Sequence, residues 1–309
     1  MISMMEKEGE AMERLKININ VSATDDEILE KMKESYRACP EAVKICNDLK
    51  IPQEKIDDNI VKIYDMVSDI NYCKKCPGLK KCQKNNPLLR TNITYSQGEV
   101  DRQLVPCQEL LKSITFKKQF IVRDFDEDIL DSNLRSIDRN AGRDLALDKY
   151  VDFIKNKRNH WIYLIGSKNS GRSYFAAALV VDAARRNRGP VCFLNSALRL
   201  RELNDMNYSR RKEDFDKRID LYSNVPILVL DDFGNEFKND FVRDAILFPI
   251  LSARASKRLV TIFTSDFTIE EVETLYSNTK AGAIRAKQIS RLISSMSGKE
   301  INLGDISIY

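Results

Sequence analysis

The stretch from Ile162 to Leu179, IYLIGSKNSGRSYFAAAL, restricts the fold of this chain more than any other. β-Branched and aromatic residues lead into a loop bounded by two glycines, and an apolar helical pattern follows. Gly166, Gly171 and Ser173 occupy the positions of a phosphate-binding loop, G-x-x-x-x-G-K-[ST], in which backbone N–H groups and a helix N-terminus face phosphate oxygens. The spacing therefore predicts a strand, a P-loop and a helix.

A second element downstream supports this interpretation. In PILVLDDFG, residues 226–234, four apolar strand residues precede Asp231 and Asp232. This is the Walker B pattern, in which the first carboxylate binds Mg2+ through water and the second polarises the attacking water. The alternative is a buried strand that ends in a solvated acidic turn. The occurrence of both elements in one alternating chain favours a nucleotide site.

Two positions depart from the usual pattern. Arg172 replaces the P-loop lysine and is bulkier and planar, so it does not reproduce a compact ammonium at the β- and γ-phosphates. Asp266 ends the strand pattern VTIFTSDF, where a neutral polar side chain usually orients the attacking water. A carboxylate there repels the γ-phosphate unless a cation intervenes. These residues leave open whether the site hydrolyses ATP.

Strand and helix patterns alternate through the second half of the chain. Strand patterns at 161–166, 189–195, 226–232 and 259–266 are separated by helical patterns at 173–188, 197–221 and 241–256. A helix opened by the capping box Thr268-x-x-Glu271, a helix at 281–296 and a short strand at 300–303 follow. Such alternation predicts right-handed crossovers and an α/β fold with a parallel sheet covered by helices.

Composition excludes several classes of function. Fifty Lys and Arg against 46 Asp and Glu leave a net charge of +4, too small by itself to indicate nucleic acid or an anionic membrane. A single histidine, His160, argues against hydrolases that depend on an imidazole. No apolar run approaches the roughly 20 residues of a membrane span, and the acidic N-terminus does not resemble a signal peptide. We therefore expect a cytoplasmic protein without a membrane partner.

The seven cysteines divide into a candidate site and others that fit a core. An odd number without a secretion signal argues against a disulfide framework. Four of them have the spacing of a closed tetrahedral thiolate site for Zn2+, with a C-x-x-C turn followed by Pro77 and Gly78: Cys73, Cys76, Cys82 and Cys107. The alternative is that the C-x-x-C pair is incidental or redox-active.

Residues 20–70 show helical periodicity. A capping box at Thr24 and Glu27 precedes one helix, and apolar residues recur at three- and four-residue intervals in a second region at Ile56, Ile60, Ile63, Tyr64 and Val67. We expect a mostly helical zinc-binding domain at 1–118, a linker at 119–140, and a P-loop domain at 141–309.

In their order, these motifs resemble the bacterial helicase loaders of the primosomal DnaI family, and more loosely DnaC. The resemblance rests on the cysteine knuckle with distal Cys107, the LDDFG and FVRDAI segments, and IFTSDF, and it covers nearly the whole chain. It implies an N-terminal zinc domain that docks on the hexameric replicative helicase. It also implies a C-terminal AAA+ ATPase domain that binds ATP and single-stranded DNA and self-assembles.

The resemblance also implies roles for individual residues. Asp231 would be the Mg2+-associated carboxylate, Asp232 the catalytic carboxylate, and Asp266 would stand at the sensor 1 position, where the family usually has Asn. Arg291 resembles the arginine finger that reaches a neighbouring subunit, although a solvated helix arginine competes with this interpretation. The nucleotide-binding loop would comprise Gly166, Ser167, Lys168, Asn169, Ser170, Gly171, Arg172 and Ser173.

We therefore expect a helicase loader that uses ATP and Mg2+ to help place a ring helicase on single-stranded DNA. One rival is a transposition-helper ATPase of the IstB type, against which the cysteine cluster argues. A second is a catalytically degenerate adaptor that holds the helicase without hydrolysing ATP.

Overall fold

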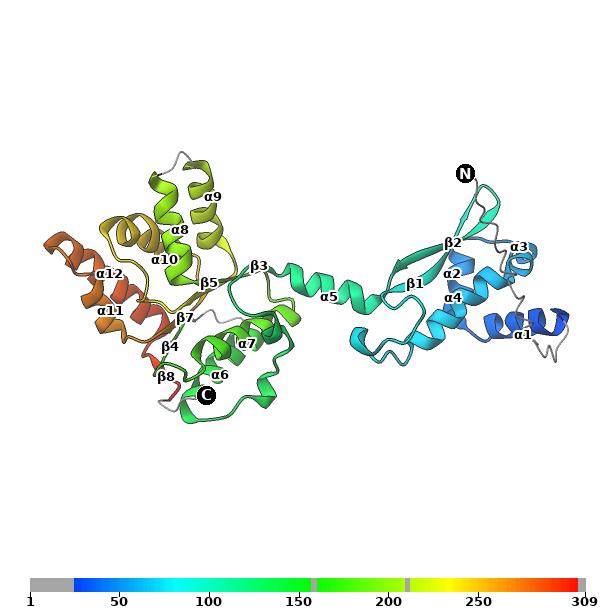
Figure 1. Ribbon diagram of the computed structural model, residues 1–309, viewed down its shortest axis with the longest axis horizontal. Coiled ribbons are helices and arrows are strands. Elements are labelled where there is room, and N and C mark those ends of the chain that lie inside the picture. The colour runs from blue at the N-terminus through cyan, green and yellow to red at the C-terminus, as the bar shows by residue number, and fades with distance from the viewer. Residues whose placement is uncertain (1–24, 157–159, 209–211, 305–309) are drawn as a thin grey trace, which may run out of the picture. The chain divides into compact units, whose positions relative to one another are not determined.

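The computed structural model describes residues 25–156, 160–208 and 212–304. The chain divides into two compact units between Leu111 and Lys112 (Figure 1). The capping box expected at Thr24 lies partly outside the described residues.

From residue 25 onward, the N-terminal unit combines four helices with a β-hairpin. Its elements are α1 (Asp25–Arg37), α2 (Pro40–Asp48), α3 (Gln53–Asp58), α4 (Ile60–Cys73), the 3-10 turn η1 (Leu79–Lys81), β1 (Leu89–Ser96) and β2 (Glu99–Pro106). The expected apolar face is confirmed, because Ile56, Ile60, Ile63 and Val67 are buried in one core. Tyr64 is only half-buried. Asn59 separates α3 from α4, which the periodicity had joined.

The hairpin was not expected from the sequence. β1 and β2 pair antiparallel along their whole length around Gln97 and Gly98, both of which have positive φ angles, 53° and 82°. Only Ile93 and Val100 of the two strands are buried, and they pack into the helical core. Because so few positions are buried, the alternation of apolar and polar residues along the two strands is weak. The Gln-Gly pair at the turn was the remaining sequence feature that could have indicated a hairpin.

The C-terminal unit has a single sheet that helices cover on both faces. Its strands are β3 (Phe120–Arg123), β4 (Ile162–Ile165), β5 (Val191–Asn195), β6 (Ile227–Asp231), β7 (Val260–Ser265) and β8 (Ile301–Asn302). Its helices are α5 (Gln108–Lys118), which begins before the boundary, α6 (Ala141–Asn156), α7 (Arg172–Arg185), α8 (Ser196–Tyr208), α9 (Lys212–Asn224), α10 (Phe248–Ser256), α11 (Ile269–Tyr276) and α12 (Lys280–Ser297).

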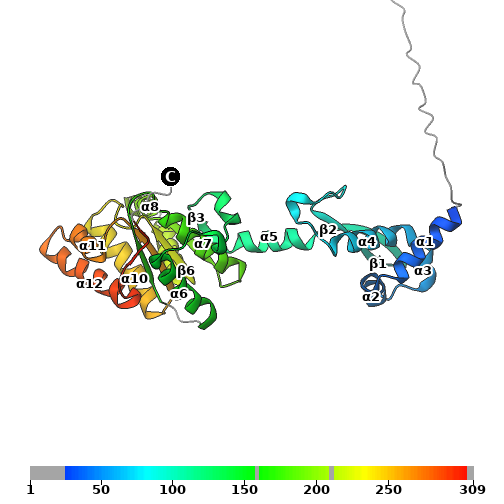
Figure 2. The ribbon, with the colours of Figure 1, turned by 90° about the horizontal axis from the view of Figure 1, so that it is seen from below.

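The strands are parallel in the order β3-β5-β6-β7-β4-β8. Residues of α6 and α7 form a core with one face of the sheet, whereas residues of α8 to α12 form a core with the other (Figures 1 and 2). Successive residues of β4 alternate between the two cores: Ile162 and Leu164 in one, Tyr163 in the other. The expected α/β fold with a helix-covered parallel sheet is therefore confirmed.

The segment 119–140, expected to be a linker, instead contributes to this unit. Phe120–Arg123 forms edge strand β3 beside β5, and the short turns η2 (Glu127–Asp131) and η3 (Leu134–Ser136) follow. Phe120, Phe125 and Ile129 pack against the core beneath α7. The segment is rich in acidic residues, so its few apolar residues did not indicate a part of the domain core. Burial of these apolar side chains against the sheet stabilises the segment there.

Two helices differ from their expected forms. The pattern at 197–221 yields α8 and α9 on either side of 209–211, which lie outside the described residues. The pattern at 241–256 begins as a π-helical turn, η4 (Val242–Leu247), before α10. Pro249 stands at the start of α10 and has no N–H to donate to the preceding turn, so the wider turn lies where the regular bond is lost.

The capping box of α11 is confirmed: Thr268 Oγ1 accepts from Glu271 N, and the Glu271 side chain accepts from Thr268 N. None of the described helices is both long and apolar enough to cross a membrane.

Arg254 on α10 is fully buried and joins α9, α10 and β7. Its guanidinium donates to the carbonyls of Tyr222 (2.8 Å), Val225 (2.7 Å) and Val260, and to Thr261 Oγ1 at 2.9 Å. No carboxylate is among these partners, so the cation serves as a multiple hydrogen-bond donor for strand and helix ends.

We predict that Arg254→Met lowers the free energy of unfolding by about 3 kcal/mol or more, because three buried carbonyls lose donors worth about 1–3 kcal/mol each. Denaturant titration checks this. Arg201→Met on the exposed side of α8 is the control and should stay within about 0.5 kcal/mol of the unaltered protein. Equal stability of the two variants would contradict the structural role.

Candidate nucleotide site

The predicted P-loop lies between β4 and α7. Gly171 caps α7 with a left-handed backbone (φ 79°), which a glycine adopts without steric cost. At Gly166 a Cβ would lie 2.7 Å from Ser170 Oγ and 3.0 Å from the carbonyl oxygen of Gly304, so the turn has room only for glycine. The loop therefore presents the N-terminus of α7 at the carboxyl end of the sheet, where anions are favoured.

The acidic pair follows β6 and is tied to the neighbouring strand β7. Thr264 Oγ1 donates to Asp231 Oδ1 at 2.6 Å and accepts from Asp232 N at 2.9 Å. Phe233 N donates to Thr264 O at 2.8 Å, and Asp232 has a positive φ of 53°. Asp231 is thereby buried at the strand end, whereas the following turn presents Asp232 to the surface.

A cavity of about 480 Å³ separates the loop from the acidic turn. It is lined by Lys168, Asn169, Ser170, Gly171, Arg172, Ser173, Tyr174, Asp232, Asn235 and Asp266. The structure thus brings together most of the residues expected at the nucleotide. Gly166, Ser167 and Asp231 are not in the lining: the first two begin the loop, and Asp231 is buried at the end of β6, where Thr264 Oγ1 donates to it.

Arg172 and Asp266, the two departures from the usual pattern, contact each other. Arg172 Nη2 forms an ion pair with Asp266 Oδ1, and Nη1 donates to the carbonyl oxygens of Gly166 and, at 2.6 Å, of Ser265. The arginine side chain is only 7% exposed. The cation that the sequence required beside Asp266 is therefore Arg172 itself.

Two lining residues were missed by sequence reasoning. Asn235 Nδ2 donates to Asp266 Oδ2 at 2.9 Å, so a neutral amide stands beside the carboxylate at the sensor 1 position. Asn235 follows the Walker B turn, and only its closeness to the acidic pair in the sequence hinted at it. Tyr174 follows Ser173 on α7 and is 40% exposed.

The pKa values of the carboxyl groups of Asp231 and Asp266 are shifted in opposite directions. Burial raises the pKa of Asp231 to about 6, and the hydrogen bond from Thr264 only partly offsets this. Burial alone would also raise the pKa of Asp266, but hydrogen bonds from Asn235 and Arg172 outweigh it, and the pKa lies below its ordinary value. Asp266 is therefore a stable anion, whereas Asp231 becomes one near neutral pH.

Arg291 lies apart from this cavity. It is exposed on α12 and makes no hydrogen bond or ion pair with the described residues. Its neighbour Arg285 is engaged instead, stacking on Phe248 with 3.9 Å from the guanidinium carbon to the ring centroid and lying 3.6 Å from Asp244. The role of Arg291 stays a prediction.

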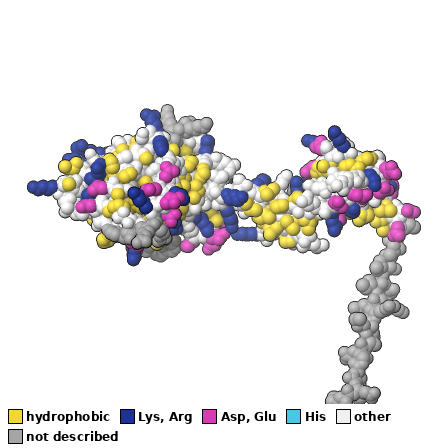
Figure 3. Space-filling model, turned by 90° about the horizontal axis from the view of Figure 1, so that it is seen from above, with side chains coloured by type: hydrophobic (Ala, Val, Ile, Leu, Met, Phe, Trp, Pro, Cys, Tyr) yellow, Lys and Arg dark blue, Asp and Glu magenta, His cyan; other side chains and the backbone are white. Residues whose placement is uncertain are grey.

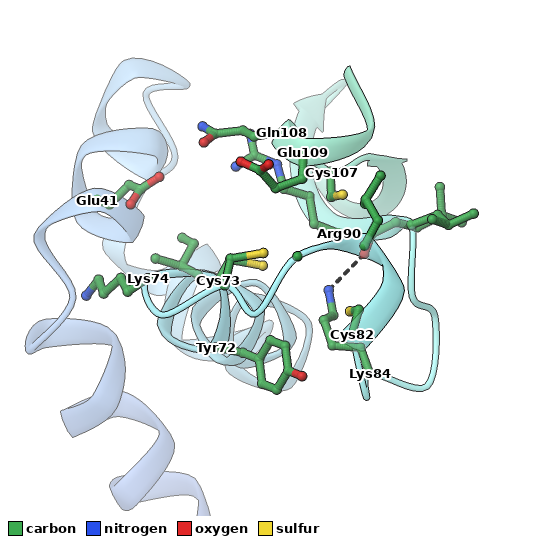
Figure 4. Close-up of a pocket in the computed structure, with 16 residues that line it drawn as sticks. Glu41, Tyr72, Cys73, Lys74, Cys82, Lys84, Arg90, Cys107, Gln108 and Glu109 are labelled. Carbon is green, nitrogen blue, oxygen red and sulfur yellow. Dashed lines mark hydrogen bonds between the residues drawn. The ribbon is translucent and has the colours of Figure 1, made fainter. Parts of the chain in front are cut away.

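The four predicted metal-binding cysteines surround one cavity in the N-terminal unit. Figure 4 shows Cys73, Cys82 and Cys107 around it, and Cys76 also belongs to its lining. They come from the end of α4, the turn after it, the end of η1, and the start of α5. The cavity measures about 190 Å³. The hairpin matters here, because it carries Cys107 back to the knuckle: Cys107 N donates to Leu88 O at 2.9 Å.

Across residues 25–156, 160–208 and 212–304, no group of three or more His, Cys, Asp or Glu side chains is arranged to hold a metal ion. Burial raises the pKa of Cys73, and the nearby Lys84 ammonium lowers it in part. Lys84 itself is fixed by Asp69 at 2.8 Å and by the carbonyl of Leu89 at 2.8 Å. The thiol chemistry suits zinc, but the side chains are not in a coordinating arrangement.

A P-loop at the carboxyl end of a parallel sheet, opposite a Walker B acid pair, defines the C-terminal unit as a nucleotide-binding α/β domain. The model of the IstB-like ATP binding protein family matches residues 94–291, and the chain belongs to this family.

Individual relatives agree with this assignment. The chain is 22% identical over 275 residues to the replicative helicase loader DnaI of Bacillus subtilis (strain 168), covering 86% of this chain and 87% of that protein. The crystal structure of DnaI is similar with a TM-score of 0.52 and 26% identity, over 60% of this chain and 97% of that one. A protein of known structure from Streptococcus pyogenes serotype M3 shares the fold, with a TM-score of 0.51 and 24% identity over 64% of this chain and 100% of that one. The resemblance to DnaI-type proteins is confirmed.

We predict that the increase in ATP affinity caused by Mg2+ falls about tenfold for each pH unit below 6, because protonated Asp231 no longer attracts the cation. The sign follows from the raised pKa: as pH rises through 6 the proton leaves and affinity rises. Calorimetric titration from pH 5 to 8 measures it. Asp231→Asn is the control, because in that variant only the phosphate groups of ATP still titrate over this pH range. The same pH profile in both proteins would contradict the assignment.

Proposed function

We propose that this protein is a replicative helicase loader whose C-terminal unit binds ATP with Mg2+. The observation that carries the ATP half is the cavity between the N-terminus of α7 and the acidic turn after β6. The amide groups of a helix N-terminus attract phosphate, and the opposite carboxylates attract the accompanying cation. The match to the ATP-binding family and the similarity to DnaI support the proposal.

The residues present suit a triphosphate and Mg2+. Ser173 and Asp231 would hold Mg2+, whose charge would stabilise the phosphates. Asp232 faces the cavity and would accept the proton of the attacking water. Asn235 and the Arg172–Asp266 pair would line the γ-phosphate end, with Asn235 in place of the usual sensor amide. Arg291 would contribute to the nucleotide site of a neighbouring subunit.

The helicase would dock on the N-terminal unit. We propose that the ATPase unit then contacts single-stranded DNA through the backbone phosphates. In the view of Figure 3, basic and acidic side chains are interspersed over the described surface of the C-terminal unit. A salt-sensitive contact through separate lysines and arginines fits the distribution on the face that this view shows.

We predict that the purified protein captures a hexameric replicative helicase and increases the amount of that helicase bound to single-stranded DNA when ATP and Mg2+ are present. Asp232→Asn should retain capture, because it lies in the other unit, and should lower ATP turnover at least about a hundredfold, since the proton acceptor is lost. Pull-down and strand-binding assays measure both steps. Capture of a transposase instead of the helicase would favour the IstB-type transposition helper.

We also propose that the four cysteines around the N-terminal cavity bind a structural Zn2+. Their thiols belong to one cavity, and Gly78 in the knuckle has a positive φ of 90° with no atom within 4 Å of a would-be Cβ, so the turn has room to close on an ion. Four thiolates form the closed tetrahedral set of structural zinc sites. The ion would join α4, η1 and the hairpin end.

We predict one zinc per chain by atomic emission, and loss of helical signal from the N-terminal unit on chelation, because structural zinc contributes on the order of 10 kcal/mol to such units. Cys76→Ser should lose the metal. Cys192→Ser in β5 is the matched control and should retain it. Zinc content unaffected by Cys76→Ser would exclude the proposed site.

A specific observation favours the second candidate function, a non-hydrolysing adaptor. Arg172, which stands where a P-loop lysine would reach the phosphates, is buried and ion-paired with Asp266 instead. ATP binding without turnover by the unaltered protein, together with helicase capture, would favour the adaptor over the ATPase.

A further inference from the structure

The guanidinium of Arg172 is fully engaged within the protein. It contacts three acceptors, the carbonyls of Gly166 and Ser265 and the carboxylate of Asp266, at the ends of β4 and β7. To reach a phosphate, Arg172 would have to leave the carbonyls of Gly166 and Ser265 without this donor and break its ion pair with Asp266. This is costly because the guanidinium and Ser265 are buried. The planar, forked group instead suits its present role, which is to cross-link two strand ends.

Lys168 is the other cation of the same cavity. It lies in the loop two residues after Gly166, is exposed, and makes no hydrogen bond or ion pair with the described residues. Its charge acts on Asp266, whose pKa it helps to lower, so its ammonium lies within electrostatic reach of the carboxylate at the far side of the cavity. A lysine has a flexible stem and three donor directions, which lets it reach a phosphate from an exposed loop.

We infer that Lys168, rather than Arg172, supplies the cation that contacts the terminal phosphates of the nucleotide, and that Arg172 and Asp266 form an internal cross-link that positions the loop. The inference rests on the ATP binding proposed above and divides between two residues the work that one P-loop lysine usually performs. It also accounts for Asp266. A carboxylate is tolerated beside the γ-phosphate because Arg172 neutralises it.

The test compares ATP affinity, with Mg2+, of the full-length chain and its variants. Lys168→Gln should bind ATP roughly tenfold to a hundredfold more weakly, the worth of one charge-assisted hydrogen bond. Its thermal unfolding without nucleotide should be nearly unchanged, because Lys168 makes no hydrogen bond or ion pair with the described residues. Lys168→Arg should retain most of the affinity. The matched control is Lys155→Gln on α6, an exposed lysine outside the cavity, which should bind as the unaltered protein does.

A second background tests the division of roles. In Arg172→Lys/Asp266→Asn, an unpaired lysine stands at the usual P-loop position, and adding Lys168→Gln should then reduce affinity less than about threefold, because the new lysine takes over the phosphate contact. Arg172→Gln alone should lower the unfolding temperature of the nucleotide-free protein, since it breaks the cross-link.

The outcomes separate this inference from the function on which it rests. If the unaltered protein binds ATP and Lys168→Gln binds equally well, the inference is overturned and the function stands. An equal loss from Lys168→Gln in both backgrounds, or loss of ATP binding by Arg172→Gln with unchanged thermal unfolding, would also overturn it. Failure of the unaltered protein to bind ATP would overturn both.

Discussion

The contacts of Arg172 with the ends of β4 and β7 are the interaction on which the candidate site depends. β4 and β7 are neighbours in the sheet, so their carboxyl ends meet at one edge, and the arginine joins the carbonyls of Gly166 and Ser265 across it. Thr264, also on β7, donates a hydrogen bond to Asp231 and so fixes the acidic turn after the next strand, β6. Loop, sensor segment and acid pair are thus held by hydrogen bonds to β7, and the cavity between them follows from this arrangement.

Charge pairing within that edge decides which groups are available to a ligand. Arg172 and Asp266 neutralise each other, and the low pKa of Asp266 keeps the pair ionised. Burial raises the pKa of Asp231, so that carboxylate needs a cation to remain charged without cost. Lys168 and Asp232 then remain at the surface of the cavity. Under the proposed function, this edge would receive an anionic nucleotide together with its divalent cation.

The N-terminal unit depends on a different constraint. Its helical core is completed by Ile93 and Val100 of the hairpin, and the same hairpin returns Cys107 to the knuckle that follows α4. The spacing of the cysteines indicated one site, and the structure places all four around one cavity. The sequence did not predict how the distal cysteine gets there, because a hairpin with two buried residues has almost no hydrophobic alternation.

The sequence by itself determined the local elements: the glycine-bounded loop between β4 and α7, the acidic end of β6, the capping box of α11, and the helix-covered parallel sheet. These depend on neighbouring residues, on periodicity, and on crossover geometry, all of which can be read along the chain. The tertiary structure decided what depends on strand order. Only because β7 lies between β4 and β6 do Arg172 and Asp266, which the sequence presents as two separate irregularities, become one ion pair, with Asn235 beside it. It also turned a segment with the composition of a linker into strand β3, because burial of Phe120 and Phe125 against the sheet outweighs the acidic residues around them.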